Sequence, residues 1–166
     1  MIRKLEDFLT NWKHESDSTL KILHTLTDES LHQKVYEEGR TLGQIAWHIV
    51  VTIDEMIGKT GLRFTATPHD AARPKTAKEM LEAYKESSDA MVQAIKEQWT
   101  DENLLDEKDM YGEMWPIALV LQVLTFHQTH HRGQLTILMR QAGLAVPGMY
   151  GPSKEEWLAF SGEAPE

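Results

Sequence analysis

Three histidines have the side-chain type and the spacing needed to bind one metal ion. His127 and His131 lie four residues apart in the segment HQTHHRGQ. At about 100° per residue, they would lie roughly 40° apart on one side of a helix, one turn above the other. Two imidazoles at this spacing can chelate a single ion. The same helical wheel places four apolar residues on their side of the helix: Val120, Leu124, Leu135 and Leu138.

The apolar setting of this pair leaves two interpretations open. A neutral imidazole has one N–H and one acceptor nitrogen, and each costs about 1–3 kcal/mol when it is buried without a partner. Metal coordination would satisfy one nitrogen of each ring. The alternative is a pair of core histidines that bond to backbone carbonyls, to water or to each other.

His48 is the third candidate ligand. With Gln44, Thr52 and Glu55 it forms a polar lane roughly 80° wide on a helix that is apolar on most other sides. If the lane faces the protein interior, His48 meets the other two histidines, and three neutral ligands leave a position open for water or substrate. If the lane is instead a thin exposed seam, the neighbouring Trp47 would contact a partner subunit.

Several further residues are candidates for supporting roles at this site. His130 would lie about 60° to the other side of the ligand pair, where it could line the same cavity but is poorly placed to be a ligand. Gln44 and Gln134 are expected to orient ligand imidazoles through their free N–H groups. His130, Glu55 and Tyr150 are the candidates for proton transfer. The alternative for each is an ordinary solvent-facing side chain.

Four long helical patterns would position these residues, and no convincing strand is present. The expected helices span residues 2–26, 41 to about 58–61, 76–100 and 116–143. Capping boxes at Thr41 and Thr76 start the second and third helices, and another at Ser153 predicts a short C-terminal helix. These patterns predict an all-α four-helix bundle, a fold whose core commonly holds metal sites built from facing helices.

Composition narrows the classes of function. The 166 residues predict a single domain, 1–166, and no apolar run approaches the roughly 18 residues of a membrane span. No signal peptide is visible, so a cytoplasmic protein with no membrane partner is expected. With 17 basic and 26 acidic residues the net charge is −9, which disfavours nucleic-acid binding. The absence of cysteine means that any thiol chemistry would use a thiol brought from outside.

The chain resembles the DinB family over nearly its whole length. The resemblance rests on EGRTLGQIAWHIV, HQTHHRGQ and PGMYGPSKEEW, which occur in the family's order and spacing. It implies a four-helix bundle with a long crossover connection, often a homodimer. It also implies a divalent metal, zinc or nickel, bound by His48, His127 and His131.

The resemblance says less about the reaction. Relatives in the wider superfamily are metal-dependent enzymes that use low-molecular-weight thiols such as bacillithiol, and this implies a transferase that conjugates such a thiol to small electrophiles. A metal would bind the incoming thiol as thiolate and lower its pKa. The alternative is a non-enzymatic, metal-binding protein of the stress or damage response.

Overall fold

The computed structural model describes residues 2–163 and is built on four long helices. Their bounds are α1 Leu5–Thr25, α2 Leu42–Ile57, α3 Ala77–Gln98 and α4 Ile117–Gln141. The hydroxyls of Thr41 and Thr76 accept hydrogen bonds from the backbone N–H groups of Gln44 (3.1 Å) and Glu79 (3.2 Å), which confirms both predicted capping boxes. The first helix begins later than predicted, at Leu5, because Asp7 accepts the N–H groups of residues 3 and 4 and fixes the helix start there.

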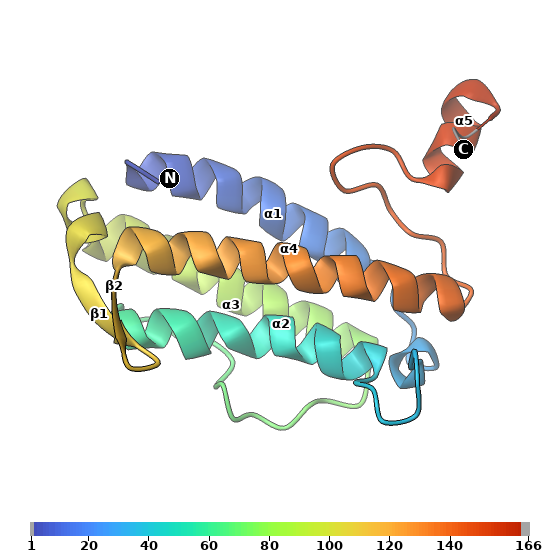
Figure 1. Ribbon diagram of the computed structural model, residues 1–166, viewed down its shortest axis with the longest axis horizontal. Coiled ribbons are helices and arrows are strands. Elements are labelled where there is room, and N and C mark those ends of the chain that lie inside the picture. The colour runs from blue at the N-terminus through green and yellow to red at the C-terminus, as the bar shows by residue number, and fades with distance from the viewer. Residues whose placement is uncertain (1, 164–166) are drawn as a thin grey trace.

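The order of the helices in the bundle requires one long connection. α1 packs against α3 and α4, and α2 packs against the same two helices, so α1 and α2 lie on opposite corners. α2 and α3 run in the same direction, and the link over residues 61–76 returns along the outside of the bundle to join them (Figure 1). The four-helix bundle with a long crossover connection is therefore confirmed.

Two features differ from or extend the expected helices. A hairpin of two short strands, β1 Glu107–Met110 and β2 Glu113–Pro116, precedes α4, although no strand was predicted. Its two-residue turn uses Tyr111 and Gly112, both at positive φ (61° and 90°), where the usual sequence signal would be Asn-Gly. The remaining short helical turns are Ser30–His32, Gly58–Thr60 and Asp101–Leu105.

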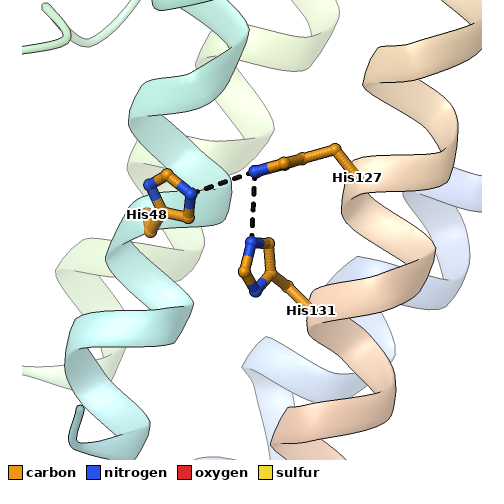
Figure 2. Close-up of side chains that lie close together, drawn as sticks. All are labelled: His48, His127 and His131. Atoms are coloured by element: carbon orange, nitrogen blue, oxygen red, sulfur yellow. Dashed lines mark hydrogen bonds between the residues drawn. The ribbon is translucent and has the colours of Figure 1, made fainter.

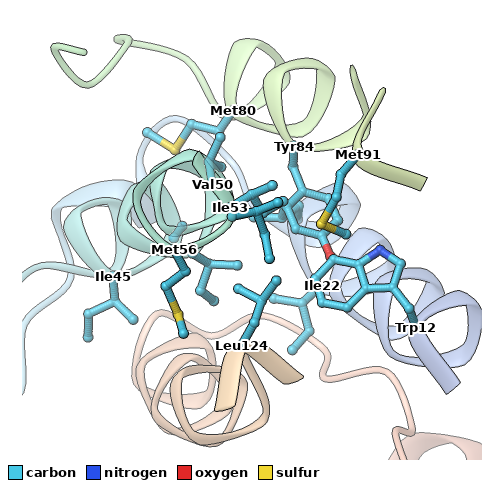
Figure 3. Close-up of a cluster of buried hydrophobic side chains, with 14 of the residues drawn as sticks. Trp12, Ile22, Ile45, Val50, Ile53, Met56, Met80, Tyr84, Met91 and Leu124 are labelled. Atoms are coloured by element: carbon cyan, nitrogen blue, oxygen red, sulfur yellow. The ribbon is translucent and has the colours of Figure 1, made fainter. Parts of the chain in front are cut away.

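The core lies where the apolar stripes of the four helices meet. Trp12, Tyr84, Met91 and Leu124 come from three helices and are fully buried around the axis (Figure 3). The indole N–H of Trp12 donates to Ser88 Oγ at 2.9 Å, so its one polar atom is satisfied. Burial of these faces is the main source of helix stability, because isolated helices of this length are marginal.

The predicted C-terminal helix is present as α5, Lys154–Ser161, with Ser153 as its N-cap. It follows a link that leaves the end of α4 and lies apart from the bundle in Figure 1. Arg140 near the end of α4 forms an ion pair with Glu155 that ties the link back. No helix among residues 2–163 is long and apolar enough to cross a membrane.

Candidate metal centre

The structure brings the three histidines together between α2 and α4 (Figure 2). His127 Nε2 lies 3.0 Å from His48 Nε2 and 3.1 Å from His131 Nε2. One candidate ligand atom from each ring lies within 4.8 Å of the other two. Three nitrogens that bind one tetrahedral zinc ion at 2.0–2.1 Å would be separated by roughly 3.3 Å. The cluster therefore has dimensions compatible with binding a metal ion.

Hydrogen bonding alone does not satisfy these three nitrogens. His131 Nδ1 lies 2.7 Å from the amide oxygen of Gln134, which only accepts, so Nδ1 carries the proton and Nε2 has a lone pair. If His127 Nε2 carries a proton, it can donate that proton to only one of the two neighbouring Nε2 atoms, and the other neighbour has no hydrogen bond. If His127 Nε2 carries no proton, its lone pair faces the lone pair of His131 Nε2. A cation at the centre would satisfy all three, so the donor set fits a metal.

The second nitrogen of His127 points to the same conclusion. His127 Nδ1 is buried and has no hydrogen-bond partner in the described part of the chain. An unpaired buried polar group costs about 1–3 kcal/mol. The sequence therefore keeps a histidine at a position where it is not satisfied by the protein alone.

Burial keeps these rings neutral at neutral pH. It is the largest cause lowering the pKa of His48, of His131 and of His127, where the pKa falls to about 4. Neighbouring histidines lower the pKa of His127 further, and so does the charge of Arg40. Neutral imidazoles offer lone pairs to a metal.

The polar lane of α2 turns inward at its centre. His48 is half-buried against α4, and Thr52 is buried, with its hydroxyl donating to the backbone carbonyl of His48 at 2.5 Å. Trp47 donates its indole N–H to the carbonyl of Ala71 in the crossover link at 2.9 Å, so the link covers it within the same chain. The exposed-seam interpretation therefore fails at His48.

Of the two glutamines expected to orient ligands, one contacts a histidine. Gln134 accepts from His131 Nδ1, and its amide nitrogen lies 3.1 Å from His130 Nε2. Gln44 is exposed, and its amide oxygen instead accepts the N–H of Thr41 in the helix cap at 2.7 Å. Gln44 therefore caps α2 and contacts no ligand histidine, contrary to the orienting role expected for it.

The three proton-transfer candidates lie in different surroundings. His130 is exposed, with its ring centroid 4.9 Å from that of His131. Glu55 accepts the hydroxyl of Tyr111 at 3.1 Å, and its charge raises the pKa of His48. Tyr150 is away from the histidines, because its hydroxyl bonds to groups on the α1 side of α4.

That α1 side holds a polar cluster that the sequence analysis missed. Arg132 and Glu15 form an ion pair in which the side chains are only 2% and 6% exposed. Arg132 also donates to the hydroxyls of Thr19 (3.0 Å) and Tyr150 (2.7 Å). The available signal was the position of Glu15, three residues after Trp12 on the buried stripe of α1.

A cleft adjoins the histidine cluster at the end of α4. It has a volume of about 470 Å³ and lies between the segment before α2 and the last turns of α4. Its lining residues are Val35, Tyr36, Gly39, Arg40, Ile45, His131, Gln134, Ile137 and Leu138. Since His131 forms part of the wall, a molecule in the cleft would reach the histidine cluster.

The bundle and its histidine cluster define a class of helical proteins with a three-histidine site between facing helices. Residues 1–164 match the DinB family, and the chain belongs to it. It is 47% identical to the uncharacterised protein YrdA of Bacillus subtilis (strain 168) over 166 residues, covering 100% of this chain and 99% of the relative.

Two solved structures support the same fold. A DinB-like protein from Bacillus cereus ATCC 10987 is 44% identical with a TM-score of 0.87, over 90% of this chain and 100% of the other. The DinB-like protein YjoA of Bacillus subtilis is 20% identical with a TM-score of 0.65, over 82% of this chain and 92% of the other. At 20% identity the likeness concerns the fold alone.

Proposed function

We propose that this chain binds one divalent metal ion through His48, His127 and His131 and uses it to transfer a low-molecular-weight thiol to small electrophiles. The observation that supports it best is the convergence of three neutral Nε2 atoms that hydrogen bonds do not satisfy. Zinc and nickel are the ions that the family resemblance implies, and imidazole ligands suit both. The thiol would come from outside, because the chain has no cysteine of its own. A bacillithiol-type thiol is the one that the family resemblance implies.

The metal, when bound, would supply a cation that lowers the pKa of the incoming thiol. The protein's residues hold the site in shape. Gln134 fixes the His131 ring so that Nε2 faces the cluster, and the Thr52 hydroxyl donates to the backbone carbonyl of His48. In the overall exchange, the thiol sulfur forms a bond to the electrophilic carbon, that carbon loses its leaving group, and the thiol proton goes to solvent.

A conjugation assay tests this function. Zinc- or nickel-loaded protein is incubated with bacillithiol and a panel of small alkyl and aryl halides, and the thioether is measured by mass spectrometry. We expect product with the wild type and none above background with His127→Ala. A matched control is His69→Ala, whose ring pairs with Asp54 on the surface and outside the cluster. Equal rates in wild type and His127→Ala would refute the transferase.

A metal-binding role without catalysis is the second candidate. It is favoured by the position of the cluster, which joins α2 to α4 and would cross-link two helices that are far apart in sequence. On this account metal raises the unfolding temperature by several degrees while no thioether forms with any thiol. Thermal unfolding with and without metal, measured beside the conjugation assay, separates the two.

A further inference from the structure

Arg40 is the one arginine or lysine among the described residues that line the cleft beside the histidine cluster. Arg40 lines the cleft together with Gln134 and His131. The Arg40 side chain is exposed to solvent and lines the same cleft as His131. No hydrogen bond or ion pair of the Arg40 side chain occurs within residues 2–163.

Arg40 has no carboxylate partner among the described residues, although acidic residues are near it in sequence. The chain carries an excess of nine acidic charges, and Glu37 and Glu38 are close in sequence. No carboxylate among the described residues lies within ion-pair distance of Arg40, and none lines the cleft. Arg132 and Arg140 pair with Glu15 and Glu155, whereas Arg40, like Arg63, is exposed and forms no ion pair with the described residues.

The backbone around Arg40 is fixed on both sides. Gly39 N donates to Tyr36 O at 3.0 Å, and Leu42 N donates to Gln33 O at 2.8 Å. A Cβ at position 39 would lie 3.0 Å from the Tyr36 ring, so glycine lets that ring pack on the turn. The guanidinium therefore projects from an anchored turn, which lowers the entropy cost of ordering it around a ligand.

The opposite wall of the cleft is apolar. Ile45, Ile137 and Leu138 line it, and Ile137 is 57% exposed. The cleft thus offers a cation, an apolar wall and one edge of the histidine cluster within a single volume of about 470 Å³, a size suited to a small molecule.

We propose that Arg40 is a specificity-determining residue that binds a carboxylate of the substrate, so that the site takes small molecules combining an anionic group with an apolar part. This deepens the proposed function and rests on it for the claim that the anionic molecule is the thiol substrate or its conjugate. A guanidinium binds a carboxylate through two parallel hydrogen bonds, a geometry that lysine or glutamine does not reproduce.

The test uses two thiols that differ in charge. Cobalt-loaded full-length protein is titrated with 3-mercaptopropionate and with 3-mercaptopropan-1-ol, and affinities are read from the thiolate-to-cobalt absorption band. We expect the wild type to prefer the acid by about fivefold to tenfold at low salt, and the preference to shrink as sodium chloride is added. Arg40→Gln should remove the preference, because it weakens binding of the acid more than binding of the neutral thiol.

Arg63→Gln is the matched control, because Arg63 is exposed and follows the opposite end of α2. It should keep the wild-type preference. Equal affinities for the two thiols in the wild type, or an unchanged preference in Arg40→Gln, would overturn the role of Arg40 and leave the proposed function standing.

A second ligand pair separates failure of this inference from failure of the proposed function. If cobalt does not bind, or binds but neither thiol changes its spectrum, the thiol function fails. Calorimetric titration with 4-phenylbutyrate and its neutral amide then decides on Arg40 alone. A preference for the acid that Arg40→Gln removes supports anion binding in the cleft, and equal affinities overturn it.

Discussion

Two polar clusters lie on opposite sides of α4, and they differ in whether the protein itself supplies a cation to the cluster. On the α1 side, Arg132 pairs with Glu15 and donates to Thr19, Tyr150 and a backbone carbonyl. On the α2 side, three imidazole nitrogens converge without enough protons to link them. The α1-side cluster pairs its opposite charges within the chain, although Arg132 Nε and Gln128 Nε2 are buried without a hydrogen-bond partner among residues 2–163, and we assign it a structural role. The histidine cluster offers lone pairs and holds no cation among its members, which suits it to bind one.

The largest expected effect on stability comes from breaking the ion pair of the α1-side cluster. Arg132→Met leaves the Glu15 carboxylate buried without its partner, and we expect the free energy of unfolding to fall by about 3–5 kcal/mol. Urea denaturation measures this, and the double variant Glu15→Leu/Arg132→Met should recover most of the loss. If the single variant loses less than about 1 kcal/mol, the ion pair does not have the structural role given to it here.

Removing a ligand from the histidine cluster should change zinc affinity strongly and stability little. His127→Ala deletes the buried, unpaired Nδ1 together with the shared Nε2, so the metal-free protein should lose little stability. Its affinity for zinc should fall by more than about 100-fold, beyond the usual effect of an outer-shell change. Competition with a chromophoric chelator gives the affinity. Similar zinc affinities in His127→Ala and wild type would contradict the comparison of the two clusters.

A smaller effect is expected from the residue that orients a ligand. Gln134→Ala frees the His131 ring to rotate, and we expect zinc affinity to fall by about tenfold. Gln44→Ala is the control, since this side chain caps α2 and should change helix stability without changing zinc affinity. Equal losses of affinity in both variants would mean that the effect comes from the fold and not from His131.

The smallest effect concerns acid. The folded protein binds a proton at His127 only near pH 4, whereas the unfolded chain binds it near the ordinary value of 6.5. The metal-free protein should therefore lose stability as pH falls from about 6.5 to about 4, because the unfolded chain holds more protons in this window. Urea denaturation across this range should show a shallower pH dependence in His127→Ala. Parallel profiles would show that His127 does not titrate as described.

Local sequence patterns were enough to predict the four helices and the pairing of His127 with His131, whereas the inclusion of His48 rested on the family resemblance. Capping boxes mark the starts of α2 and α3, and the four-residue spacing in α4 puts His127 and His131 on one face. Whether His48 faced them depended on how α2 turns against α4. Helical periodicity gives the face of one helix, but not which neighbour covers it.

Other features depend on contacts between segments far apart in sequence. The pairing of Glu15 with Arg132 spans 117 residues, and its partner Tyr150 comes from the link after α4. The cleft joins the segment before α2 to the end of α4, so neither segment alone indicates that Arg40 and His131 line the same cleft. The hairpin was missed because its four-residue strands are short and its Tyr-Gly turn lacks the common signal.

Metal content after reconstitution tests the central claim most directly. The full-length protein and His48→Ala are loaded with zinc or nickel, freed of excess metal by gel filtration, and measured by elemental analysis. We predict one metal ion per chain in the wild type and a much smaller fraction in His48→Ala, with both proteins equally helical by circular dichroism. A wild type that retains no stoichiometric zinc or nickel, or a His48→Ala variant that retains as much as the wild type, would contradict the three-histidine site.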